Sequence, residues 1–167
     1  MMKALGALDK MLDKVSDLSA KMASERRPAS YFENALLQSR LVFDQFPLVQ
    51  QIQIACDNAK GCAARLAEVE VPKYVDSETT VAELKARIAK TLAFLDTIKP
   101  EQIIGKDNIK VVLPYFAPKH LSGFDYVTAY LIPNFYFHVT TAYSILRANG
   151  IQIGKADFAG GGLPLKD

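Results

Sequence analysis

Four long segments of this chain repeat an apolar residue every three or four positions, and this pattern restricts the possible folds more than any other feature. The spacing places the apolar residues on one face of an α-helix, so each segment has a single stripe to bury. The segments span residues 3–23, 46–66, 80–98 and 133–149, with a shorter helical piece at 31–40. Because four such helices bury their stripes most simply against one another, the sequence predicts an all-α four-helix bundle.

Residues at the ends of these segments support the predicted helix boundaries. Pro47 suits the first turn of a helix, and Gly150 suits the left-handed conformation that often follows a helix end. Thr80 and Glu83 match a capping box, in which a hydroxyl and a carboxylate accept hydrogen bonds from amides at the helix start. Glu83 and Arg87 are four residues apart, so we expect an ion pair between them on the helix surface.

The stretch between the third and fourth long helices has a different composition. Residues 109–113 and 126–130 are rich in β-branched and aromatic side chains, which favour strands. Turn-forming residues separate them: Pro114, Pro118, Ser122 and Gly123. The sequence therefore predicts a small β-hairpin inserted in the bundle. With 167 residues, we expect one domain that covers residues 1–167.

Charge and hydropathy exclude two classes of partner. The 20 lysine and arginine residues nearly balance the 18 acidic residues and are scattered along the chain, so nucleic acid is not an expected partner. No apolar run approaches the roughly 20 residues that span a bilayer. Asp9 and Lys10 also interrupt the place where a secretory signal would be apolar. We therefore expect a cytoplasmic protein that does not bind membranes.

The two cysteines, Cys56 and Cys62, lie in the same predicted helix. Six helical residues rise about 9 Å and place the two thiols on different faces, which is too far apart for a disulfide. We interpret both as small apolar residues of a reduced protein.

A polar strip lies on one face of the last long helix. Asn134, His138 and Thr141 are spaced four and three residues apart, beside an apolar face that the bundle buries. His138 is then either a hydrogen-bonded core residue or a ligand for something bound in the interior. Since the chain has 2 histidines, a site built from three histidines of one chain is excluded.

Residues 134–150, with Asp157 downstream, resemble the last helix of the DinB-like superfamily. Within that superfamily, the chain is similar to a bacterial family that forms a domain of unknown function. The shorter motifs that carry this resemblance are Ser39–Leu41, Gln53–Asp57, Pro133–Phe135, Phe137–His138, Ala142–Tyr143, Ile145–Arg147, and Gly154, Lys155 and Asp157. The resemblance implies a four-helix bundle, often dimeric. It also implies a divalent metal held by one histidine of the second helix and a His-x-x-x-His pair of the last. Some members are thiol-dependent transferases or isomerases.

The sequence departs from that pattern at the implied metal ligands. His138 matches the second histidine of the pair, but Asn134 stands at the first position, and Gln50 or Gln53 stands where the histidine of the second helix would be. Amide oxygens bind transition metals more weakly than imidazole does. We therefore expect no tightly bound cofactor, and zinc or nickel would be held only weakly through His138.

Two functions follow from the resemblance and its departures. The first is a DinB-like bundle with a degenerate metal site, which binds an unknown small molecule or partner in a polar pocket formed by Gln50 or Gln53 with Asn134, His138 and Thr141. The alternative is a metal-dependent enzyme of the thiol transferase or isomerase type, with His138 as metal ligand or general base.

A purely structural dimer is a third interpretation. The resemblance implies a homodimer, and the apolar face of residues 4–18 is broad enough to contact more than one neighbour.

Overall fold

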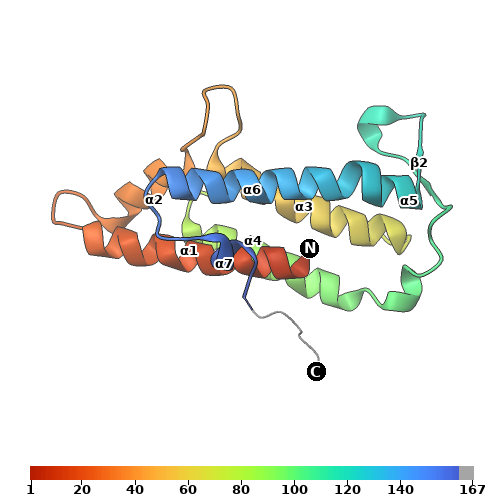
Figure 1. Cartoon of the computed structure of the whole chain (residues 1–167), viewed down its shortest axis with the longest axis horizontal. Helices are drawn as coiled ribbons and strands as arrows, with labels where there is room; N and C mark the ends of the chain where they lie inside the picture. Colours follow the sequence, from red (N-terminus) through yellow and green to blue (C-terminus); the bar gives the residue numbers. More distant parts are fainter. Residues whose placement is uncertain (162–167) are drawn as a thin grey trace.

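The computed structural model describes residues 1–161 of the chain, so the end of the predicted single domain, residues 162–167, lies outside the described residues. Its long helices are α1 (Met2–Met22), α3 (Leu48–Leu66), α4 (Val81–Thr97) and α6 (Ile132–Ala148). Short helices are α2 (Ala29–Leu37), α5 (Gly123–Asp125) and α7 (Lys155–Phe158). The long helices lie side by side, as the sequence predicts (Figure 1).

Helices α3 and α4 are neighbours that run in the same direction, whereas α1 and α6 run the opposite way (Figure 1). Side-chain contacts follow this parallel register, since Gln53 contacts Glu78 just before α4, and Asp57, one turn further along α3, contacts Arg87 in α4. Because α3 and α4 are parallel, the chain that connects them must run back along the length of α3 before α4 begins. Residues 67–80, which we name the crossover segment, make that return.

Apolar side chains from all four long helices form the main core. Leu8, Ile52, Leu84 and Ile145 have no exposed surface at all. A smaller second cluster joins the far end of α3 to the hairpin region, and its buried members are Cys62, Leu66, Val111, Leu113, Tyr126 and Leu131. Full burial of one such aliphatic side chain contributes about 1.5–3 kcal/mol, so these two clusters hold the bundle together.

The predicted capping box at the start of α4 is confirmed. The Thr80 hydroxyl accepts a hydrogen bond from the Glu83 amide at 3.2 Å, and the Glu83 carboxylate accepts one from the Thr80 amide at 3.0 Å. The predicted surface ion pair between Glu83 and Arg87 is wrong. The Glu83 carboxylate instead accepts hydrogen bonds from backbone amides at the start of the helix, and Arg87 is buried among other partners.

The hairpin exists, but its second strand was predicted at the wrong place. Strand β1 (Lys110–Val111) pairs antiparallel with β2 (Leu121–Ser122). The Ser122 hydroxyl accepts a hydrogen bond from the Asp125 amide at 3.0 Å and so caps helix α5. Residues 126–130, which the sequence predicts as a strand, belong instead to a π-helical turn, Tyr126–Leu131, that continues into α6.

The stretch after α6 also differs from the sequence prediction, which gave it little regular structure. Helix α7 packs on α1, where the Asp157 carboxylate lies 2.7 Å from Nζ of Lys14 and also accepts a hydrogen bond from the Gly154 amide. Within residues 1–161, none of the helices combines the length and the apolar character needed to cross a membrane.

Candidate functional site

His138 lies on the face of α6 that packs against α3, where it is buried beside Gln51. The amide nitrogen of Gln51 donates to the carbonyl oxygen of Phe46 at 2.9 Å. Its amide oxygen therefore faces the imidazole and accepts a hydrogen bond from Nδ1 of His138 at 2.7 Å. Burial lowers the pKa of His138, so the ring is neutral near pH 7. The neutral ring then carries its free lone pair on Nε2.

The structure directs the two predicted glutamines of α3 away from His138. Gln50 is exposed, and Gln53 turns to the other side of α3, where it donates to Glu78 at 2.8 Å. Asn134 is half-buried, and the Thr141 hydroxyl donates to the carbonyl oxygen of Phe137 in its own helix. The partner of His138 is thus Gln51, which the sequence analysis missed.

One sequence signal could have identified Gln51. It lies three residues after Leu48 and four before Ala55, so it shares the apolar face of its helix with two residues that are fully buried. A polar residue on that buried face needs a hydrogen-bonding partner inside the bundle.

A second group of polar side chains gathers between α3, α4 and the crossover segment. The Arg87 side chain is only 2% exposed, and its guanidinium lies 2.8–2.9 Å from carboxylate oxygens of Asp57, Asp76 and Glu78. It also donates to the carbonyl oxygen of Val75 at 3.2 Å. Its Nε is buried without a hydrogen-bond partner. Arg87 therefore fastens the crossover segment to the bundle.

A cleft of about 430 Å³ lies next to this group, between the crossover segment and α4. Its lining includes Lys73, Tyr74, Ser77, Glu78, Arg87 and Lys90. The ammonium groups of Lys60 and Lys90 lie 3.9 Å and 4.3 Å from the centre of the Tyr74 ring, within the range of cation–π contacts. Gln53 reaches the cleft indirectly, through its hydrogen bond to Glu78.

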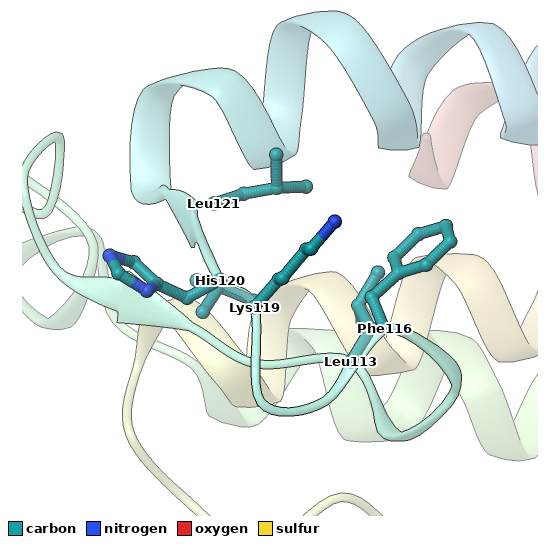
Figure 2. A pocket seen from close by; sticks show the side chains of 6 residues that line it. Leu113, Phe116, Lys119, His120 and Leu121 are labelled. Carbon is teal, nitrogen blue, oxygen red and sulfur yellow. The ribbon is translucent and has the colours of Figure 1, made fainter.

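A smaller pocket of about 220 Å³ lies at the hairpin and is lined by Val111, Leu113, Phe116, Lys119, His120 and Leu121. In Figure 2 the Lys119 side chain extends between Leu121 and Phe116, whereas the His120 ring points the other way. The pocket is thus mostly apolar with one cationic side chain inside it.

Both cysteines are buried and free, and they belong to different clusters of the core. Burial raises the pKa of each thiol to about 11. The thiols are therefore protonated at neutral pH, and neither is an activated nucleophile.

Comparisons with known proteins agree with the helical architecture. A family model described as a domain of unknown function, DUF1993, matches residues 1–159. The chain is also similar to a solved structure, the crystal structure of a DinB family member protein from Shewanella denitrificans, with 39% sequence identity and a TM-score of 0.79. That match covers 100% of this chain and 96% of the other. No curated protein matches the chain.

Proposed function

Because the chain belongs to the DUF1993 family of the DinB-like superfamily, we propose that it is a ligand-binding bundle protein that takes up a small anionic molecule in the cleft between the crossover segment and α4. The observation that carries this proposal is the unequal pairing of charges around the cleft. Carboxylates surround Arg87 at its base, whereas Lys73 and Lys90 have no carboxylate partner within residues 1–161.

The side chains of the cleft favour an anion over a cation. The carboxylate of Glu78 is held by Arg87 and Gln53, and that of Glu83 is held by backbone amides, so neither is free to bind a cation. Within residues 1–161 neither Lys73 nor Lys90 pairs with a carboxylate, and the Lys90 ammonium lies over the Tyr74 ring at the edge of the cleft. Both ammonium groups can therefore make charge-assisted hydrogen bonds to carboxylate or phosphate oxygens.

The proposal includes a degenerate metal site in place of a working one. Within the described range 1–161, no three His, Cys, Asp or Glu side chains lie together as metal ligands. His138 would offer Nε2, since its Nδ1 is bonded to the Gln51 amide, and Asn134 stands one turn earlier on α6. Such a donor set does not fit a tightly held zinc or nickel ion, because amide oxygens are weak ligands for these metals.

Calorimetric titration with citrate and with inorganic phosphate tests the proposal. We expect the double variant Lys73→Met/Lys90→Met to bind at least fivefold more weakly than the natural protein, because both ammonium groups of the cleft are lost. The matched control is Lys10→Met/Lys21→Met, which removes the same charge from exposed positions of α1 away from the cleft. Equal weakening in both double variants would show a general charge effect and refute the site.

A second candidate is a metal-dependent enzyme of the thiol transferase or isomerase type. The fixed tautomer of His138 favours it, since Nε2 is left free as a ligand or proton acceptor. One tightly bound metal ion per chain in the purified natural protein would support this candidate over the first.

We also propose that the protein is a homodimer, through a different surface from the one that the sequence suggested. The apolar stripe of α1 is used within one chain, where Leu8, Met11 and Leu12 have no exposed surface. Residues 41–46 instead form a protruding loop with Phe43 92% exposed. A second copy that packs on this loop would cover it. The two free cysteines support a cytoplasmic location.

A further inference from the structure

The hairpin pocket in Figure 2 is built by local structure that is separate from the proposed anion cleft. Val111 and Leu121 are cross-strand partners in the two-stranded sheet, and they form adjacent walls. Leu113 is buried and lies beside Phe116 in Figure 2, and the 3₁₀ turn Pro114–Phe116 places the Phe116 ring across the pocket from Leu121. The walls are therefore apolar and held in place by backbone pairing.

Lys119 is the one cationic side chain that extends into this apolar space in Figure 2. Within residues 1–161 its ammonium has no carboxylate partner. His120 also lines the pocket, but in Figure 2 its ring points in the opposite direction from the Lys119 side chain. A ligand that satisfies both features needs an apolar body and one negative charge.

We propose that this pocket binds a small apolar carboxylate, such as a single-ring aromatic acid, with its carboxylate on Nζ of Lys119. The volume fits this class, because an apolar cavity of about 150 Å³ accepts benzene, and this pocket holds about 220 Å³. The ring of the ligand would pack on Leu113, Leu121 and Phe116, and its carboxylate would pair with the Lys119 ammonium that extends between them.

Benzoate and its neutral counterpart benzyl alcohol separate the two parts of the proposal. We expect benzoate to shift the amide resonances of residues 111–121 in heteronuclear NMR titrations. Lys119→Met should weaken the binding of benzoate about tenfold, because one charge-assisted hydrogen bond is lost. It should leave the affinity for benzyl alcohol unchanged. Phe116→Ala should weaken the binding of both ligands, because the half-exposed Phe116 ring would contact the apolar body of each.

Lys110→Met is the matched control, since Lys110 is exposed on β1 and does not line the pocket. Its benzoate affinity should equal that of the natural protein. The proposal is overturned if benzoate does not shift the amide resonances of residues 111–121. It is also overturned if Lys110→Met and Lys119→Met weaken benzoate binding equally. The Lys73→Met/Lys90→Met variant should keep benzoate binding, so failure of the anion cleft and failure of this pocket are distinguishable.

Discussion

The hydrogen bond between His138 and Gln51 depends on the rotational phase of α3, which the sequence left open among neighbouring glutamines. Successive helical residues differ by about 100° around the axis, so Gln50, Gln51 and Gln53 face three directions. The sequence pattern favours Gln50 or Gln53 as the partner of His138, whereas packing of α3 on α6 presents Gln51 to the histidine. The choice of His138 as an interior polar residue needed only the helical period, and its burial agrees with that prediction.

Replacing Asn134 by histidine should strengthen metal binding. Asn134 and His138 are one turn apart on α6, so Asn134→His places two imidazoles at the spacing that helical metal sites use. We expect the natural protein to bind zinc or nickel weakly and Asn134→His to bind at least about tenfold more tightly, because imidazole is the stronger donor. Isothermal titration calorimetry at neutral pH measures the difference.

The control for this prediction is Asn134→His combined with His138→Ala, which should bind no better than the natural protein. Equal affinity in the natural and Asn134→His proteins would show that these two side chains do not reach one ion.

Removing the buried guanidinium of Arg87 should destabilise the fold. Arg87→Met leaves the carboxylates of Asp57, Asp76 and Glu78 without their common partner. We expect the free energy of unfolding to fall by about 2 kcal/mol, less than for a fully buried pair because Asp57 and Asp76 can rehydrate. Urea denaturation measures this loss. Lys10→Met, at an exposed lysine of α1, should change stability by less than about 0.5 kcal/mol.

The same ion pairs should make the stability depend on acid pH. Burial alone would raise the pKa of Glu78, but hydrogen bonds from Arg87 and Gln53 lower it below its ordinary value of 4.5. A carboxyl group with a lowered pKa in the folded state stabilises the protein above its ordinary pKa, and this contribution is lost as the pH falls through the folded value. The free energy of unfolding should therefore drop as the pH falls below the ordinary value of 4.5, and the drop should be smaller in Arg87→Met. Identical pH profiles for the two proteins would contradict this assignment.

At the scale of elements, two glycines should respond to the same substitution in opposite directions. A Cβ on Gly123, where β2 passes into α5, would overlap the backbone carbonyl of Lys106, whereas a Cβ on Gly6 in α1 meets nothing. We expect Gly123→Ala to lower the free energy of unfolding by about 2 kcal/mol, since backbone there must move. Gly6→Ala should raise it by about 1 kcal/mol through helix propensity. Thermal unfolding of both variants gives the comparison, and stabilisation by Gly123→Ala would rule out the close approach.

The long helices were predictable because their apolar period, caps and breakers all lie close together in the sequence. For the hairpin, the sequence predicted that a small insertion lies between the last two long helices, but not where its second strand lies. Residues 126–130 have strong strand propensity, but tertiary packing of Tyr126 and Leu131 beside Leu113 holds them in a helical turn instead. The crossover contacts of Arg87 were not predictable either, because Asp57 and Asp76 are far from it in the sequence.

For the whole molecule, the association state should depend on the protruding loop at residues 41–46. The natural protein should be a dimer at micromolar concentration in light scattering, and Phe43→Glu should make it monomeric. A charge at this 92% exposed position disrupts an apolar contact between copies but cannot disturb the core of a single chain. Phe116→Glu, also at an exposed ring, should remain dimeric. A monomeric natural protein would refute the proposed homodimer.

The parallel pairing of α3 and α4 sets a lower limit on the length of their connection. Helix α3 has 19 residues and so spans about 28 Å, a distance that needs about nine residues of extended chain. The crossover segment has the fourteen residues 67–80, which leaves a surplus of several residues. Homologous chains can therefore shorten this connection by a few residues without changing the order of the helices, whereas a two-residue turn at this point would force α4 to reverse direction and produce a different topology.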